Sequence, residues 1–200
     1  MRHMKNDIYR KITIPQFTVL TGLLIIFFGT LLLSSPLCSF SNVGLWEALF
    51  TATSAITVTG LSIIDIGNDL TLFGQITLAI MLLVGGLGLM AITSFLQGFI
   101  VTGTDLRCRL DKGRTLDEFG VGGVGRTFRG IVITAFVLIS FGSITLYNFG
   151  FSDISDTGKR LWMSIFHSIS AYNNAGFALQ LDSLESYRSN GVVSGVIISL

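Results

Sequence analysis

A stretch of this sequence occurs twice, 116 positions apart, and the repeat limits the possible folds more than any other feature. The first copy reads LWEALFTATSAITVTGL over 45–61, and the second reads LWMSIFHSISAYNNAGF over 161–177. Six of the sixteen positions up to the shared glycine are identical, without a gap. The identical pairs are Leu45/Leu161, Trp46/Trp162, Phe50/Phe166, Ser54/Ser170, Ala55/Ala171 and Gly60/Gly176. Repetition at a fixed spacing indicates a chain built from two similar structural units.

Each copy begins as an apolar helix that is too short to cross a membrane. Residues 46–55 would form about three turns, or roughly 15 Å, half of a hydrocarbon core of about 30 Å. In the first copy TVTG follows at 57–60, and β-branched residues closed by glycine continue a helix poorly. We therefore predict two re-entrant pore loops, in which a short helix leads into an extended segment, Ile56–Gly60 or Tyr172–Gly176. Such backbone is tolerated at membrane depth only where it lines a cavity or is buried.

The composition indicates an integral membrane protein, because 50% of the residues are hydrophobic and 12% are charged, against about 25% charged in soluble domains. Uncharged segments long enough to span a bilayer flank the loops at 17–34, 72–101 and 130–147. Residues 191–200 begin another such helix. The fold class that we predict is an all-α membrane protein of repeated helix–pore loop–helix units, with the second unit incomplete.

The chain divides into four parts on this interpretation. Residues 1–16 form a basic tail, 17–101 the first unit, 102–129 a linker, and 130–200 the second unit. The tail and the linker hold ten of the thirteen Lys and Arg residues, whereas 35–71 holds none. Basic residues favour the cytoplasmic side. We therefore expect a multi-pass protein of the cell (inner) membrane, with its N-terminus in the cytoplasm and both loops outside.

The extended segments are the candidate ion-binding site. Freed carbonyl oxygens can replace the hydration shell of a cation, and the C-terminal end of a short helix adds a partial negative charge. The candidate ligands are Thr57, Val58, Thr59, Gly60, Asn173, Asn174, Ala175 and Gly176. We rank backbone carbonyls ahead of the Thr hydroxyls and Asn amides, which can instead point outward and brace the loop. Acidic residues nearby (Asp65, Asp69, Asp182) are either a cation-concentrating mouth or a solvated rim.

An enzyme is not expected, since the loops and spans contain only two ionisable side chains, Glu47 and His167. Glu47 suits the N-terminal dipole of the first short helix, and His167 is better explained as a buried hydrogen-bonding residue than as a metal ligand. A serine hydrolase would need a second ionisable group beside its nucleophile. We expect no bound cofactor, and the net charge of +1 does not indicate a nucleic-acid partner.

Two further patterns have structural explanations. Residues 120–125 read GVGGVG and match G-x-G-x-x-G, but no strand precedes them, so a flexible connector is favoured over a dinucleotide site. The glycines of VGGLG at 84–88 are better explained by close helix packing than by a hinge. Cys38 and Cys108 fall at opposite membrane faces, which excludes a disulfide between them.

The segments ITVTGL, VGGLGLM and FHSISAYNNAGF resemble the potassium-translocating subunits of the Ktr/Trk/HKT superfamily, closest to the bacterial KtrB type. The resemblance implies potassium uptake through a filter with one glycine per loop, here Gly60 and Gly176, in a channel-like fold. It also implies a homodimer, a cytoplasmic ring of nucleotide-binding regulatory subunits, and uptake that often depends on Na⁺. The choice between K⁺ and Na⁺ is left open.

The family carries four units in one chain, whereas this sequence carries two. We favour a missing second half over the association of two copies. An alternative function is that of a non-conducting membrane scaffold or assembly fragment, in which the glycines serve helix packing alone.

Overall fold

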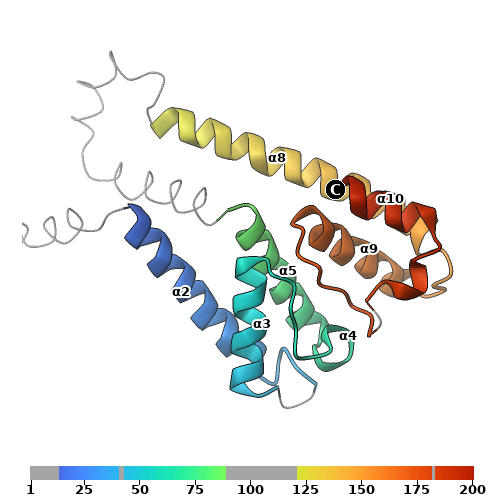
Figure 1. The fold of residues 1–200 in the computed structure, drawn as a ribbon, viewed down its shortest axis with the longest axis horizontal. Coiled ribbons are helices and arrows are strands. Elements are labelled where there is room, and N and C mark those ends of the chain that lie inside the picture. The colour runs from blue at the N-terminus through green and yellow to red at the C-terminus, as the bar shows by residue number, and fades with distance from the viewer. Residues whose placement is uncertain (1–13, 41–42, 89–120, 182) are drawn as a thin grey trace, which may run out of the picture.

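The computed structural model describes residues 14–40, 43–88, 121–181 and 183–200, which form helices joined by loops (Figure 1). In chain order these elements are α2 (Ile14–Leu33), α3 (Leu45–Thr57), α4 (Ile66–Asp69), α5 (Leu72–Gly86), α8 (Val121–Thr145), the π-helix η1 (Leu146–Gly150), α9 (Thr157–Tyr172), the 3-10 helix η2 (Glu185–Tyr187) and α10 (Gly191–Ser199). Within these ranges there is no β-strand, only an isolated antiparallel bridge between Ser39 and Leu70. The described part of the chain is therefore all-α.

The first half packs three helices together. The short helix α3 lies against both α2 and α5, which also contact each other. The side chains that α3 buries include Ala48, Ala52 and Ala55, which are small enough to let neighbouring helices approach. Its first turn is closed by Glu47, whose Oε2 accepts the backbone N–H of Gly44 at 2.9 Å. Glu47 thus has the structural role that the sequence predicts.

The second half repeats this plan with a long helix and a short one. Helix α8 has 25 residues and α9 has 16, and they pack against each other, with α10 contacting both. Asp156 caps α9 by accepting the backbone N–H groups of Gly158 (2.9 Å) and Lys159 (3.3 Å). A charged cap of this kind satisfies donors that the helix leaves free. Both short helices thus begin with a carboxylate at their N-terminal end.

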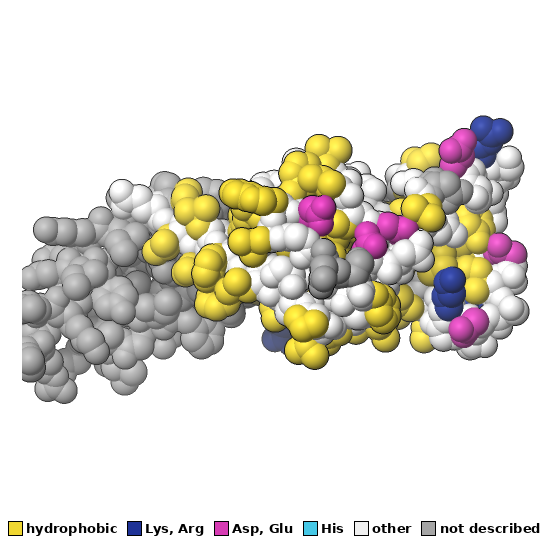
Figure 2. Space-filling view, turned by 90° about the horizontal axis from the view of Figure 1, so that it is seen from below, with side chains coloured by type: hydrophobic (Ala, Val, Ile, Leu, Met, Phe, Trp, Pro, Cys, Tyr) yellow, Lys and Arg dark blue, Asp and Glu magenta, His cyan; other side chains and the backbone are white. Residues whose placement is uncertain are grey.

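Apolar side chains cover much of the outer surface. Phe27 and Phe28 of α2 are 57% and 60% exposed, and Phe136 and Phe141 of α8 are 73% and 68% exposed. Figure 2 shows hydrophobic side chains standing on one face of the molecule, with acidic ones among them. Such extensive apolar exposure is unusual for a protein in water and suits contact with lipid. The segment Phe128–Gly150 is long and apolar enough to span a membrane, while the apolar helices Thr18–Leu33 and Leu72–Gly86 are shorter.

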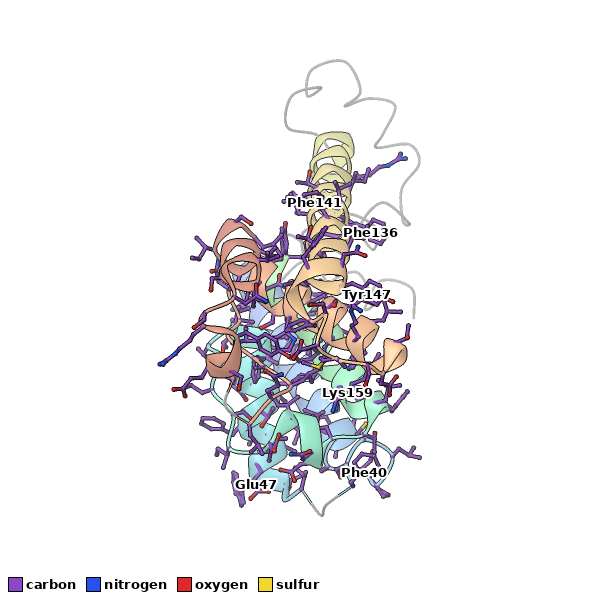
Figure 3. The ribbon with its side chains drawn as sticks, turned by 90° about the vertical axis from the view of Figure 1, so that its right-hand side faces the viewer. Phe40, Glu47, Phe136, Phe141, Tyr147 and Lys159 are labelled. Atoms are coloured by element: carbon purple, nitrogen blue, oxygen red, sulfur yellow. The ribbon has the colours of Figure 1, made fainter. Side chains whose placement is uncertain are left out.

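Different helices reach the two ends of the molecule. Phe40 and Glu47 lie toward one end, whereas Phe136 and Phe141 on α8 lie toward the other (Figure 3). The linker expected at 102–129 would join the molecule at the α8 end, although 89–120 lie outside the described residues. So do the tail up to residue 13, Cys108 and Asp182.

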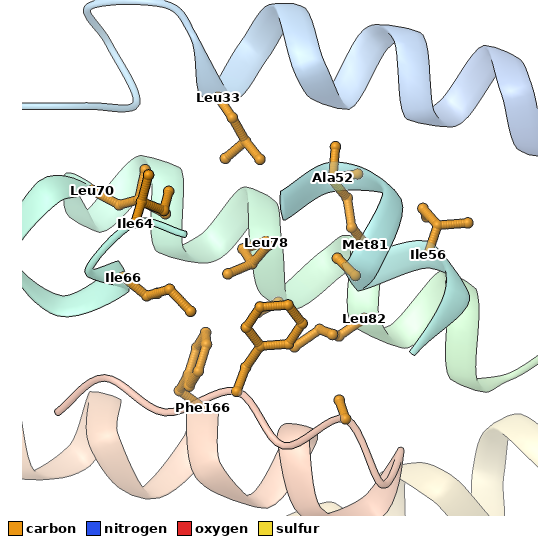
Figure 4. Close-up of a cluster of buried hydrophobic side chains, with 14 of the residues drawn as sticks. Leu33, Ala52, Ile56, Ile64, Ile66, Leu70, Leu78, Met81, Leu82 and Phe166 are labelled. Atoms are coloured by element: carbon orange, nitrogen blue, oxygen red, sulfur yellow. The ribbon is translucent and has the colours of Figure 1, made fainter. Parts of the chain in front are cut away.

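One hydrophobic cluster joins the two halves (Figure 4). Phe166 of α9 is fully buried and packs among side chains of the first half, including Leu78 and Leu82 of α5. Burying a side chain of this size stabilises the fold by roughly 1.5–3 kcal/mol. The loops that follow α3 and α9 are therefore held against a shared core.

Three boundaries differ from the sequence predictions. The residues Ile56, Thr57 and Tyr172 were expected to be extended but belong to the ends of α3 and α9. Thr57 can stay helical because its hydroxyl donates to the carbonyl of Thr53 at 2.8 Å. Residues 121–125 are not a flexible connector, since α8 begins at Val121. Helix α5 ends at Gly86, where the long span to 101 was expected to continue, and Gly88 follows with φ 85°.

Candidate functional site

The loops after the two short helices meet backbone to backbone. A Cβ atom built on Gly60 would overlap the carbonyl oxygen of Ala175 and lie 3.3 Å from the Cα of Gly176. Gly60 and Gly176 also line the same open cavity, of about 390 Å³, together with polar residues such as Asp65 and Gln180. The structure therefore brings together the two glycines that the repeat pairs in sequence.

The first loop turns by a Schellman motif at the end of α3. Val58 has φ 55°, and the backbone N–H of Thr59 donates to the carbonyl of Ser54 at 3.0 Å. The N–H of Val58 donates to the carbonyl of Ala55 at 3.3 Å. This pair of bonds terminates a helix and satisfies two of its free carbonyls. Gly60 is left-handed again, with φ 76°.

The second loop has the same turn at the equivalent positions. Asn174 has φ 52°, the N–H of Ala175 donates to the carbonyl of Ser170 at 2.8 Å, and the N–H of Asn174 donates to that of Ala171 at 2.9 Å. Gly176 then has φ 71°. Both loops therefore place left-handed residues at the same two positions of the repeat, although their side chains differ.

The serine shared by the two copies contacts the residue after the glycine. In the first loop the N–H of Leu61 donates to Ser54 Oγ at 2.8 Å. In the second loop the hydroxyl of Ser170 donates to the carbonyl of Phe177 at 2.7 Å. Ser54 and Ser170 are both 4% exposed; the Ser170 contact is buried and the Ser54 contact is partly buried. Sequence reasoning counts these serines as identities without giving them a role, although their equal spacing of seven residues was the available signal.

These hydrogen bonds fix the directions of several peptide carbonyls. In a planar trans peptide, the C=O of one residue points opposite to the N–H of the next, and none of the described peptide bonds is cis. Because the Leu61 N–H points back to Ser54, the Gly60 carbonyl points away from α3. By the same argument the carbonyl of Val58 points away from α3 and that of Asn174 points away from α9.

The candidate side-chain ligands mostly bind the protein itself. The hydroxyl of Thr59 donates to Ser54 Oγ at 2.9 Å, and the hydroxyl of Thr57 donates to the carbonyl of Thr53 at 2.8 Å. Asn173 is buried, its Nδ2 donates to the carbonyl of Ile169 at 2.8 Å, and its side chain fills the space beside Gly86. Asn174 is exposed. Of these four side chains, only that of Asn174 reaches open space without a recorded bond to the protein.

Helix α5 supports both loops from behind. A Cβ atom on Gly85 would lie 2.5 Å from the carbonyl oxygen of Ile56 at the end of α3. The indole Nε1 of Trp162 donates to Gln75 Oε1 at 2.6 Å, which ties α9 to α5. Gln75 in turn donates from Nε2 to the carbonyls of Leu70 (3.2 Å) and Ile66 (3.3 Å). The glycines at 85 and 86 therefore serve close packing, as the sequence suggests.

The remaining ionisable side chains have local roles. His167 is 2% exposed and donates from Nδ1 to the carbonyl of Met163 at 2.8 Å, so it is a buried hydrogen-bonding residue. Asp65 caps α4 through the N–H groups of Gly67 (3.0 Å) and Asn68 (3.3 Å). In the described ranges, His, Cys, Asp and Glu side chains form no group of three that could hold a metal ion.

Comparison with known proteins identifies relatives over almost the whole chain. The family model TrkH, described as a cation transport protein, matches residues 16–200. Ktr system potassium uptake protein B of Vibrio alginolyticus is 35% identical over 188 residues, which cover 93% of this chain and 41% of that protein. The protein of the same name from Bacillus subtilis (strain 168) is 34% identical over 197 residues, covering 95% of this chain and 42% of the relative.

A third relative is the potassium/sodium uptake protein NtpJ of Enterococcus hirae. It is 31% identical over 205 residues, which cover 100% of this chain and 45% of that protein. The chain thus spans less than half of the length of these curated relatives. On the strength of the family match, the chain belongs to the TrkH family of cation transport proteins and is a membrane protein.

Proposed function

We propose that this chain contributes two of the loops that form a potassium-uptake filter lined by backbone carbonyls. The observation that carries the proposal is the hydrogen bond from the Leu61 N–H to Ser54. It turns the Gly60 carbonyl away from α3, and Gly60 and Gly176 line one shared cavity. Carbonyl oxygens so directed can substitute for the water around a dehydrated cation.

The electrostatics of the short helices support a cation at this place. Helices α3 and α9 both end at the loops, and a helix C-terminus carries about half an elementary negative charge. The left-handed residues at 58, 60, 174 and 176 give both loops the same backbone bends, and the carbonyls of Val58, Gly60 and Asn174 point away from the helices. The proposed ligands are the carbonyls of 57–60 and 173–176. Side-chain ligands are less favoured, because the side chains of Thr57, Thr59 and Asn173 already donate hydrogen bonds within the protein.

The names of the relatives support a choice of ion. Two of them are named potassium uptake proteins and one is named a potassium/sodium uptake protein. We propose K⁺ as the transported ion, with Na⁺ as a coupled or competing ion. A homodimer and a cytoplasmic ring of nucleotide-binding subunits remain part of the proposal, and they rest on the family resemblance alone.

The proposed orientation has both loops outside and the N-terminus in the cytoplasm. Phe40 is 77% exposed and lies at the end of the molecule that would face outward. A Phe40→Cys variant should react with a membrane-impermeant maleimide added to intact cells. The background should carry Cys108→Ser, while Cys38 can stay because it is fully buried. Labelling only after the membrane is permeabilised would show that Phe40 faces the cytoplasm and that the proposed orientation is wrong.

Rubidium uptake tests the function itself. The intact protein in liposomes should take up Rb⁺, and excess K⁺ should compete better than excess Na⁺. Gly60→Ser and Gly176→Ser should lower this preference, because both positions have left-handed φ values and line the shared cavity. Gly195→Ala is a matched control, since a Cβ there meets nothing within 4 Å. Absence of Rb⁺ uptake in the unaltered protein would favour a non-conducting scaffold.

A further inference from the structure

We propose that Ser54 and Ser170 are positioning residues that hold the two filter loops against their own helices and so set the directions of the filter carbonyls. This inference rests on the proposed function. It extends that function from the residues that would face the ion to a pair of buried hydroxyls behind them. Each serine lies seven residues before the position that it contacts, Leu61 or Phe177.

Ser54 acts on the Gly60 carbonyl through a single peptide group. The N–H of Leu61 and the C=O of Gly60 belong to the same planar unit, so the bond to Ser54 Oγ prevents that unit from rotating. Ser54 Oγ also accepts the hydroxyl of Thr59 at 2.9 Å, and the Ser54 carbonyl accepts the Thr59 N–H at 3.0 Å. One residue of α3 therefore anchors both sides of the peptide segment between Val58 and Leu61.

Ser170 acts on the second loop from the equivalent position but with the opposite polarity. Its hydroxyl donates to the carbonyl of Phe177 at 2.7 Å, while its own carbonyl accepts the N–H of Ala175 at 2.8 Å. The Phe177 carbonyl lies one peptide beyond that of Gly176. Ser170 therefore makes hydrogen bonds to the residues before and after Gly176, but none to the peptide group that carries the Gly176 carbonyl. Loss of this hydroxyl should disturb the filter less than loss of the Ser54 hydroxyl.

The same two helices carry buried hydroxyls that make no such contact. Thr51 on α3 and Ser168 on α9 are both fully buried. Neither hydroxyl has a hydrogen-bond partner in the described part of the chain. They are matched controls, because removing them changes the same helix, at similar depth, without freeing a loop peptide.

The test measures ion preference in the intact protein, as the ratio of K⁺ to Na⁺ needed to halve Rb⁺ uptake into liposomes. Ser54→Ala should reduce the preference for K⁺ by about five-fold, the factor expected for one hydrogen bond. Ser170→Ala should reduce the preference by only about two-fold, because Ser170 bonds to the carbonyl of Phe177 and not to the peptide group that carries the Gly176 carbonyl. Thr51→Val and Ser168→Ala should leave the preference unchanged.

A general packing defect would lower the amount of folded protein without changing the ratio. Uptake is therefore normalised to monodisperse protein recovered from each preparation. Ser54→Cys provides a second variant of similar size with a weaker acceptor, and its effect should lie between those of serine and alanine. This variant keeps the test decisive if Ser54→Ala does not fold.

Two outcomes separate failure of this inference from failure of the proposed function. If Gly60→Ser changes the preference but Ser54→Ala and Ser54→Cys do not, the filter assignment stands and the positioning role is wrong. If Gly60→Ser also leaves the preference unchanged, the filter assignment fails. Equal effects of Thr51→Val and Ser54→Ala would likewise overturn the positioning role, because burial alone would then explain the result.

Discussion

The carbonyl oxygen of Ala175 occupies the space that a Cβ atom on Gly60 would need. The reverse contact is looser, because a Cβ on Gly176 would come only within 3.8 Å of the Gly60 Cα. Both glycines have left-handed φ values, of 76° and 71°. Gly60 therefore meets two constraints, strain and close approach, whereas Gly176 meets only the first among the described residues.

This difference predicts unequal effects of alanine at the two glycines. Gly60→Ala should lower the preference for K⁺ strongly, because the loops must move apart to admit the methyl group. Gly176→Ala should retain uptake with reduced preference, since it adds only the cost of a left-handed alanine, roughly 1–2 kcal/mol. Uptake and preference measured side by side in liposomes test the order. Equal loss in both variants would show that steric contact between the loops does not govern the filter.

A second prediction concerns the turn that precedes each glycine. Asn174 is exposed and has φ 52°, a conformation that asparagine tolerates and β-branched residues resist. Asn174→Val should lower the thermal unfolding midpoint by roughly 2–4 °C, the shift expected for about 1 kcal/mol in a protein of this size. Asn174→Gly should leave the midpoint unchanged or raise it. A valine variant as stable as the unaltered protein in detergent would contradict the left-handed turn.

A third prediction uses the two tryptophans of the repeat. Trp162 donates to the buried Gln75, whereas its repeat counterpart Trp46 is 80% exposed. Trp162→Phe leaves Gln75 Oε1 without this donor and should cost about 1–3 kcal/mol in the free energy of unfolding. Trp46→Phe should change it by less than about 0.5 kcal/mol. Denaturant titrations of the two variants provide the comparison, and equal costs would remove the assigned role of the indole bond.

A fourth prediction concerns the glycine behind the first loop. Gly85→Ala places a methyl group against the carbonyl oxygens of Ile56 (2.5 Å) and Ala55 (2.9 Å). We expect it to destabilise the protein and to reduce the preference for K⁺, because the end of α3 must shift. Gly195→Ala, in α10 with open space around it, should be neutral or stabilising, as alanine favours a helix over glycine by about 1 kcal/mol. Thermal unfolding and Rb⁺ uptake of the two variants measure the contrast.

Hydrophobic length and the repeat were sufficient to predict the all-α architecture and the two short helices. They could do so because a segment of about three turns cannot cross a bilayer, and because the glycine keeps its register in both copies. The ends of the short helices were less predictable. Ile56 and Thr57 remain helical through tertiary burial and a hydroxyl bond to Thr53, which intrinsic propensity does not contain.

The contacts that hold the loops against the neighbouring helices could not be predicted from one sequence. Asn173 appears beside Asn174 in the motif, yet one side chain is buried against Gly86 and the other is exposed. Asn173 is the C-cap of α9, whereas Asn174 has a left-handed φ of 52°. The role of Gln75 could not be predicted either, since it depends on partners brought near by helix packing, whereas Ser54 at least recurs in both copies of the repeat.

The hydrogen bonds that shape each loop after its helix join residues no more than seven positions apart. Contacts so close in the chain form early, so the curve of the first loop is already encoded in a short stretch of nascent polypeptide. We expect it to be acquired during insertion, before the ribosome has made the second unit. The second unit then adds the contact between the Ala175 carbonyl and Gly60 to a first loop that has already folded.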